Sequence, residues 1–406
     1  MRLRGTCTAL AALLIMAAPG GLAVGAAASP VPPPAPVPTD SGNSPAVPDP
    51  HPPLGGRNAD GEAVGGPRLL SRGNVLPAGA PALPDDLTAQ AWMVTDLDTG
   101  KILAARDPHG RYQPASIQKL LTTVALLPLL PGSRTVTVSR KSAETEGSHA
   151  GLVAGGKYTI DQIFEGLLLV SGNDCAEALS AAAGGRSQTV ALMNRTALDL
   201  GAVDTYIQTP SGLDGWQQLT SAYDMTLFLR AALAQPRFLA YDNTAKSVLP
   251  RQQINGFGPV ELYNQNLEFL TTVKGALAAK TGFTDAAQHT FVGAIKRDGH
   301  RYGVVLLRAQ RYPDDQWVQA KNLVNWARKL PASAAAVGTL ITPTPPAASS
   351  SASATPDHGT SGGASSRSIT ADGGGFPGWL QIVLSVILVG GATLITRRAL
   401  RTSRSR

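Results

Sequence analysis

Two long segments rich in proline, glycine, alanine and serine confine any folded core of this 406-residue chain to its middle. They cover residues 29–84 and 331–375, and both contain few aromatic or β-branched residues. Segments of this composition cannot bury enough apolar surface to offset the entropy of ordering the chain, so we expect both to be disordered linkers. Residues 85–330 remain between them, and a stretch of this size is long enough for one sizeable core.

Both ends of the chain carry apolar stretches typical of membrane targeting. Residues 1–28 combine a basic start, an apolar run and an alanine-rich cleavage site, which predicts a secretory signal peptide, with an uncleaved anchor as the alternative. Residues 376–396 are apolar and uncharged, and this length spans a bilayer as a helix. The arginine-rich tail 397–406 predicts a cytoplasmic C-terminus. We therefore expect the folded core to lie outside the cell, held at the cell membrane by a single C-terminal span.

Charge, histidine spacing and cysteine usage argue against a nucleic-acid-binding protein, a metalloprotein and a disulfide-linked fold. The net charge is +7, and five of the arginines belong to the C-terminal tail, so no nucleic-acid-binding surface is implied. The six histidines show no metal-ligand spacing, and we expect neither a metal nor another cofactor. Once the signal peptide is removed, Cys175 is the one remaining cysteine, so no intramolecular disulfide can form. We expect its thiol to pack as a small hydrophobic group.

Hydrophobic periodicity within the core predicts both helices and antiparallel strands. Strand-like patterns over residues 91–105 and 290–308 are interrupted by Asp98-Thr99-Gly100 and Asp298-Gly299, which indicates two hairpins. Helical spacing marks residues 116–127, 160–169, 174–183, 221–233 and 314–329, with Ser221 as a cap. This order favours an α+β fold in which helices flank an antiparallel sheet, and it disfavours a doubly wound parallel sheet.

Three short motifs within the core supply the groups for serine catalysis. They are Ser116-Ile-Gln-Lys119, Ser171-Gly-Asn173 and Lys280-Thr281-Gly282. A serine hydroxyl is a weak nucleophile without an adjacent base, and a lysine three residues later on a helix shares its face. That lysine acts as a base when desolvation, or a second cation such as Lys280, lowers its pKa. The N–H group of Ser116 at the helix start can face a developing oxyanion.

The other two motifs complete this chemistry, although each alone is commoner as an ordinary turn. The hydroxyl of Ser171 can pass a proton to a leaving amine, while the amide of Asn173 can hold Lys119 or a substrate carbonyl. Lys280 with the adjacent threonine hydroxyl can bind a substrate carboxylate at a strand edge. Gly282 lets a peptide backbone approach closely. Together the three motifs indicate an acyl-transfer site.

These motifs, in this order, occur in penicillin-binding proteins and class A β-lactamases. The chain resembles the low-molecular-mass penicillin-binding proteins, which are serine-type D-Ala-D-Ala carboxypeptidases. The resemblance covers about residues 91–307, and it implies a serine β-lactamase/DD-peptidase-like fold, α+β (α/β), with a helical subdomain. It is carried by the strings Asp96-Leu-Asp-Thr-Gly100, Pro114-Ala-Ser-Ile-Gln-Lys119, Leu167-Leu-Leu-Val-Ser-Gly-Asn-Asp174, Thr209-Pro-Ser-Gly-Leu-Asp214 and Lys280-Thr-Gly-Phe-Thr284.

The resemblance also implies a reaction. Ser116 would be acylated by the D-alanyl carbonyl of a peptidoglycan stem peptide, releasing the terminal D-alanine, and water would then hydrolyse the acyl-enzyme. β-Lactams would act as slowly deacylating mimics of this substrate. By the same resemblance Lys119 would be the general base, Ser171 the proton relay and Asn173 a positioning group. Lys280-Thr281-Gly282 would form the carboxylate site. The backbone N–H of Phe283 would be the second oxyanion donor, beside that of Ser116.

Other readings of the same motifs remain open. A β-lactamase would carry an E-x-x-L-N loop between the second and third motifs, and Glu261-Leu-Tyr-Asn264 lacks that pattern. A DD-endopeptidase would use the same site, and a non-catalytic cell-wall scaffold would keep the same fold. Many relatives carry a β-rich second domain and an amphipathic anchor, where this chain has a linker and a spanning helix. Gln288-His289 stand where the family often has glycine, which leaves the stem-peptide side-chain preference open.

Overall fold

The computed structural model describes residues 55–342 of the chain, with the exception of residues 257 and 332. The predicted signal peptide, membrane span and basic tail all lie outside the described residues. Within them, the structure contains no helix that is long and apolar enough to cross a membrane.

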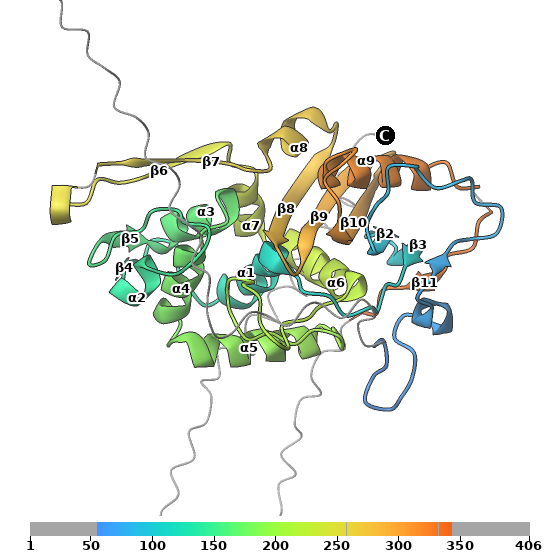
Figure 1. Cartoon of the computed structure of the whole chain (residues 1–406), viewed down its shortest axis with the longest axis horizontal. Coiled ribbons are helices and arrows are strands. Elements are labelled where there is room, and N and C mark those ends of the chain that lie inside the picture. The colour runs from blue at the N-terminus through green and yellow to red at the C-terminus, as the bar shows by residue number, and fades with distance from the viewer. Residues whose placement is uncertain (1–54, 257, 332, 343–406) are drawn as a thin grey trace, which may run out of the picture. The chain divides into compact units, whose positions relative to one another are not determined.

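A seven-stranded antiparallel sheet runs through the described residues, with the strand order β1-β3-β2-β10-β9-β8 and with β11 paired to β3 (Figure 1). Its strands are β1 (Asn74–Val75), β2 (Ala91–Asp96), β3 (Lys101–Arg106), β8 (Ala276–Thr284), β9 (Gln288–Arg297), β10 (His300–Ala309) and β11 (Gly338–Thr339). Both predicted hairpins are confirmed. Asp298 and Gly299 join β9 to β10 with φ angles of 51° and 85°, as a tight two-residue hairpin turn requires.

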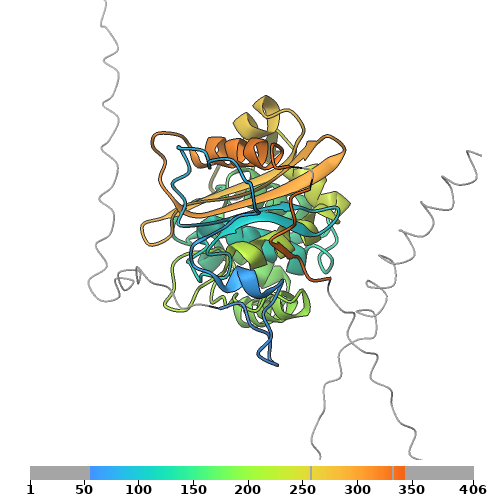
Figure 2. The ribbon, with the colours of Figure 1, turned by 90° about the vertical axis from the view of Figure 1, so that its right-hand side faces the viewer.

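Helices lie on both faces of this sheet, as Figures 1 and 2 show. Helices α8 (Leu267–Thr272) and α9 (Gln316–Ala327) cover one face, and α1 (Lys119–Leu126) and α6 (Ala222–Leu233) cover the other. Next to α1 lies a mainly helical region that carries two small two-stranded sheets. It comprises α2 (Arg140–Ala143), α3 (Ile160–Leu169), α4 (Asn173–Ala182), α5 (Arg186–Asp199), α7 (Pro236–Asp242), β4 (Thr135–Thr137) with β5 (Lys157–Thr159), and β6 (Lys246–Leu249) with β7 (Val260–Tyr263).

Successive side chains along a strand point to opposite faces of the sheet, so the sheet contributes to two hydrophobic cores. Trp92 and Val94 of β2 pack under α9, whereas Ala91 and Met93 of the same strand face the helices on the other side. The larger core continues from α1 and α6 into α3, α4 and α5. The predicted α+β class, an antiparallel sheet flanked by helices with a helical subdomain, is therefore confirmed.

Local capping explains where two predicted helices begin. The hydroxyl of Thr159 accepts the N–H of Gln162, and the Gln162 side chain accepts the N–H of Thr159, which forms a capping box at the start of α3. Ser221 caps α6 by accepting the N–H of Asp224 at 3.1 Å, as predicted. The helix predicted from residue 116 begins instead as a short 3-10 turn, η2 (Ala115–Gln118), which carries Ser116 into α1.

The inner ends of the two predicted linkers are folded, which corrects the linker prediction for residues 55–84 and 333–342. The 3-10 turn η1 (Pro67–Leu70) buries Leu69 completely, and β1 pairs with β3. At the other end β11 also pairs with β3. A few well-placed apolar side chains anchor these stretches, although their average composition predicts disorder.

Candidate active site

Ser116 lies in η2, which packs against strands β8 and β9 of the large sheet. The preceding residue, Ala115, has a φ angle of 49°, which is the left-handed region that non-glycine residues rarely adopt. The hydroxyl of Thr290 in β9 donates a hydrogen bond of 2.9 Å to the carbonyl of Pro114. A turn with an unfavourable backbone angle is thus held in place by the adjacent strand, and such turns are common at catalytic sites.

The side chain of Lys119 is fully buried, and its amine contacts three oxygen atoms. The Nζ atom lies 2.8 Å from Ser116 Oγ, 2.7 Å from Asn173 Oδ1 and 2.7 Å from the carbonyl oxygen of Ser211. The amide and carbonyl oxygens can only accept hydrogen bonds. A neutral amine therefore donates its two protons to them and directs its lone pair toward the serine hydroxyl. This is the geometry of a general base.

The electrostatic surroundings of Lys119 favour the neutral amine. Burial lowers the pKa of Lys119 well below its ordinary value, and the positive charge of Lys280 lowers it further. Asp174 has a smaller opposing effect. The structure therefore brings the first and third motifs close enough for one lysine to affect the ionisation of the other.

The second motif contacts Lys119 through the side chain of Asn173. Asn173 begins α4, and its Nδ2 donates to the carbonyl of Glu146 at 2.8 Å, which leaves Oδ1 facing Lys119. Ser171 has a φ angle of 61°, and its buried Oγ makes no hydrogen bond to any described residue. Its hydroxyl therefore has unused hydrogen-bonding capacity among the described residues.

The third motif lies on β8, the last strand in the sheet order. Lys280 is fully buried, and its Nζ donates to the carbonyl of Thr281 at 2.7 Å. Burial lowers the pKa of Lys280 to about 8, although the neighbouring carboxylate of Asp242 opposes this shift. Burial also raises the pKa of Asp242 to about 7, while its carboxylate accepts the N–H of Ala279 at 2.9 Å. Lys280 is therefore a cation at neutral pH.

Gly282 is required by the packing of β8 against η2. A Cβ atom at this position would lie 2.7 Å from the backbone nitrogen of Ser116 and 2.5 Å from Thr290 Oγ1. The sequence predicts that this glycine admits a substrate backbone. The structure gives a further reason for it, because any side chain would push β8 away from the nucleophile.

Replacing Gly282 by alanine is expected to lower the rate of acylation at Ser116 at least about 10-fold, because small displacements of reacting groups are costly. The rate of labelling by a fluorescent penicillin measures this effect. Gly73→Ala is the matched control, since a Cβ at residue 73 meets only Ser71 Oγ, at 3.7 Å. Equal labelling rates for the two variants would contradict this packing role.

The loop of residues 209–214 completes the site. In the sequence, only the family resemblance indicated this loop. The carbonyl of Ser211 holds Lys119, and Asp214 accepts a hydrogen bond of 2.7 Å from the hydroxyl of Thr284 at the end of β8. Gln118 donates to the carbonyl of Thr209 and ties the same loop to η2. Backbone carbonyls leave no signature in residue types, so the string Thr209–Asp214 was the only available signal.

Two further sequence candidates, Cys175 and Phe283, are close in sequence to the second and third motifs. Cys175 is buried, as expected for a thiol that packs as a small hydrophobic group, and burial raises its pKa well above the ordinary value. Phe283 directly follows Gly282, and its side chain is 56% exposed. Its ring packs against His289 with centroids 4.6 Å apart. Gln288-His289 thus lie across the β8–β9 hairpin from Phe283 and Thr284.

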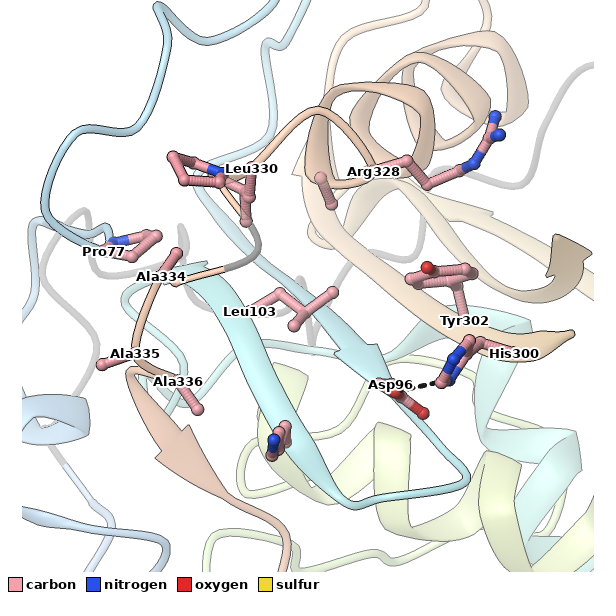
Figure 3. A pocket seen from close by; sticks show the side chains of 13 residues that line it. Pro77, Asp96, Leu103, His300, Tyr302, Arg328, Leu330, Ala334, Ala335 and Ala336 are labelled. Atoms are coloured by element: carbon pink, nitrogen blue, oxygen red, sulfur yellow. Dashed lines mark hydrogen bonds and ion pairs between the residues drawn. The ribbon is translucent and has the colours of Figure 1, made fainter. Parts of the chain in front are cut away.

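A pocket of about 230 Å³ lies at the far end of the sheet, and none of the three motifs contributes to it (Figure 3). Asp96, Leu103, His300 and Tyr302 line it together with residues that follow α9. Asp96 and His300 are already paired at 2.9 Å. The nearby carboxylate of Asp98, which could join them in holding a cation, is itself paired with Arg301 at 2.6 Å. This pocket is therefore separate from the candidate active site.

Comparison with known proteins agrees with this geometry. Residues 78–311 match the model of the Peptidase_S11 family, described as D-alanyl-D-alanine carboxypeptidase. The chain is 39% identical over 261 residues to D-alanyl-D-alanine carboxypeptidase DacB2 of Mycobacterium tuberculosis, covering 62% of this chain and 86% of that protein. It is 26% identical to DacF of Bacillus subtilis, and that match covers 59% of this chain and 62% of the relative.

Solved structures show the same similarity. A crystal structure of D-alanyl-D-alanine carboxypeptidase from Mycobacterium tuberculosis superposes with a TM-score of 0.61 at 38% identity, covering 65% of this chain and 99% of the other. The Streptomyces K15 DD-transpeptidase superposes with a TM-score of 0.57 at 22% identity, covering 62% of this chain and 100% of the other, and supports the fold alone. The family match covers more than half of the chain, and so this protein belongs to the D-alanyl-D-alanine carboxypeptidase family Peptidase_S11.

Proposed function

We propose that this protein is a serine D-Ala-D-Ala carboxypeptidase that removes the terminal D-alanine from peptidoglycan stem peptides through an acyl-enzyme on Ser116. The observation that carries the proposal is the environment of Lys119. A buried lysine whose two N–H groups face acceptors and whose third contact is a serine hydroxyl is arranged to remove the proton of that hydroxyl. This arrangement suits a serine hydrolase better than a passive cell-wall scaffold.

The proposed acylation step uses these groups in the following order. Lys119 takes the proton from Ser116 as Oγ attacks the carbonyl carbon of the penultimate D-alanine. Backbone N–H groups of Ser116 and Phe283 would stabilise the resulting oxyanion. The peptide C–N bond then breaks, and the leaving amine receives a proton from Ser171, which regains one from Lys119. Water hydrolyses the ester, which regenerates the serine hydroxyl and releases the shortened peptide.

The carboxylate site favours a carboxypeptidase. Lys280 is a buried cation on β8, the last strand in the sheet order, and its Nζ donates to the backbone carbonyl of Thr281. A substrate with a terminal carboxylate would pair with this cation. β-Lactam antibiotics also carry a carboxylate next to a reactive amide, so we expect them to acylate the same serine. The free D-alanyl carboxylate of a stem peptide is the group that this site would recognise.

The activity should depend on pH with limits on both sides. Lys119 must be neutral to act as a base, so activity is lost as the pH falls through its lowered pKa. Lys280 must be charged to bind a carboxylate, so activity is lost as the pH rises through about 8. We expect a bell-shaped profile of kcat/KM for release of D-alanine. A profile that stays flat from neutral pH to well above pH 8 would contradict the role of Lys280.

We also propose that the protein is exported and held at the cell membrane by residues 376–396, with the catalytic domain outside. The support is the sequence of these residues and the basic tail 397–406. Fractionation of cells that express the full chain, or a chain ending at residue 375, tests this. The full chain should remain with membranes after alkaline extraction, and the shortened chain should not. Equal partitioning of the two would exclude residues 376–396 as the anchor.

Mass spectrometry of stem peptides after incubation with the purified full chain tests the activity. Loss of one alanine from a pentapeptide stem is the expected result. Loss of cross-linked dimers without loss of alanine would instead identify an endopeptidase. Rapid turnover of penicillin would identify a β-lactamase, and no change in any of these substrates would leave the scaffold role.

A further inference from the structure

We infer that Asp174 is a positioning residue for the catalytic lysine, because its carboxylate holds the loop of residues 146–152 that orients Asn173 toward Lys119. This inference rests on the proposed function, since it concerns the same site. Asp174 belongs to none of the three motifs, although it directly follows the second.

The carboxylate of Asp174 is completely buried and is surrounded by backbone N–H groups. It accepts hydrogen bonds from Ala150 at 3.0 Å, from Gly151 and Leu152 at 2.9 Å each, and from Cys175 at 2.9 Å. A buried carboxylate is costly unless such donors satisfy it. Three of the donors are consecutive along the chain, so Asp174 fixes the path of the loop at residues 150–152.

The preceding part of this loop holds Asn173 at two points. The backbone N–H of Asn173 donates to the carbonyl of Ser148 at 2.6 Å, and its Nδ2 donates to the carbonyl of Glu146 at 2.8 Å. A carbonyl accepts only from the NH₂ end of the amide. The Oδ1 end must therefore face Lys119, which lies 2.7 Å away.

The orientation of this amide determines where the lone pair of Lys119 points. With Oδ1 toward the amine, Asn173 and Ser211 take the two amine protons and the lone pair faces Ser116. With the amide reversed, a donor would face a donor and the base would lose one of its two acceptors. Loss of the loop should therefore lower the rate of acylation, and it should affect carboxylate binding at Lys280 much less.

Gly147 shows how closely the loop fits against Asn173. Its φ angle is 89°, and a Cβ atom at this position would lie 2.6 Å from Asn173 Nδ2. Gly147 is exposed, so alanine at this position would disturb the amide while leaving the hydrophobic core intact. The position offers a second test that does not alter the buried carboxylate.

Two matched pairs of variants of the full chain separate positioning from stability. Asp174→Asn replaces the carboxylate with an amide that presents donors to the loop. Its control, Asp224→Asn, alters an equally buried carboxylate that accepts the N–H of Asp204 at 2.8 Å, away from this loop. Gly147→Ala is compared with Gly155→Ala, which also has a positive φ, 77°, but would meet only the tip of Ile254. The measurements are the acylation rate with a fluorescent penicillin, the Tm, and kcat and KM for release of D-alanine.

Asp174→Asn and Gly147→Ala are expected to lower the acylation rate and kcat at least about 10-fold, because the base is misdirected, while KM changes little. The two controls should stay within about twofold of the wild type, because neither position contacts Asn173 or the loop of residues 146–152. Wild-type acylation by folded Asp174→Asn would overturn the inference. An equal loss in Asp224→Asn at equal destabilisation would also overturn it.

If Asp174→Asn does not fold, the pair Gly147→Ala and Gly155→Ala decides: equal acylation rates in these two variants overturn the inference. Failure of penicillin to label the wild type would contradict the proposed function itself, and the inference would fall with it. Labelling of the wild type and of the controls keeps these two failures distinguishable.

Discussion

Replacing Lys119 by alanine is expected to reduce acylation of Ser116 about 1,000-fold, which is within the range attributed to a general base. The variant loses the group that lies 2.8 Å from the serine hydroxyl, and no other basic side chain contacts that hydroxyl in the described part of the chain. The rate of labelling by a fluorescent penicillin gives the size of the loss. Circular dichroism checks that the fold is intact.

A second substitution at this position distinguishes the role of the Lys119 amine as a base from the volume that its side chain fills. Lys119→Arg keeps a long side chain with N–H donors, but a guanidinium does not lose its proton in proteins and so cannot act as the base. Both variants should therefore be inactive if lysine is the base. A normal acylation rate in folded Lys119→Ala would remove lysine from this role.

Replacing Lys280 by alanine is expected to lower kcat/KM about 30- to 1,000-fold for peptides with a free terminal carboxylate, the loss typical when one partner of a buried charge pair is removed. Lys280 is a fully buried cation on β8, and its Nζ donates to the backbone carbonyl of Thr281. A peptide with an amidated C-terminus lacks the carboxylate. The variant should therefore discriminate much less than the wild type between the free and the amidated peptide.

The same substitution should also move the acid side of the pH profile. The charge of Lys280 lowers the pKa of Lys119, so its removal raises that pKa. Activity should then be lost at a higher pH than in the wild type. Lys296→Ala removes a solvent-exposed lysine on β9 and serves as the control for net charge. Unchanged discrimination between the free and amidated peptides in Lys280→Ala would place the carboxylate site elsewhere.

Local sequence signals predicted much of the fold, because the forces that set those elements act over a few residues. The span 160–169 matches α3, whose first turn is fixed by Thr159 and Gln162, and Ser221 caps α6 where expected. The pair Asp298-Gly299 forms the turn between β9 and β10 for the same reason. Residues 55–84 were assigned wrongly to a linker because their anchoring depends on pairing with β3, which is distant in sequence.

The candidate site was predicted in its side chains and not in its backbone groups. The sequence indicated Ser116 and Lys119, and the structure places the amine beside the hydroxyl. It did not indicate the carbonyl of Ser211, because a main-chain oxygen is common to every residue type. The hydrogen bonds from residues 150–152 to Asp174 were missed for the same reason. The effect of Lys280 on Lys119 depends on tertiary packing, although the motifs suggested it.

The central claim is that Ser116 carries the acyl group, and intact-protein mass spectrometry followed by peptide mapping tests it most directly. The purified full chain would be incubated with a penicillin and, separately, trapped during turnover of a D-Ala-D-Ala peptide. We predict one covalent adduct per chain, located on the peptide that contains Ser116 and absent in Ser116→Ala. An adduct on another residue, or an unchanged adduct in Ser116→Ala, would contradict the proposed mechanism.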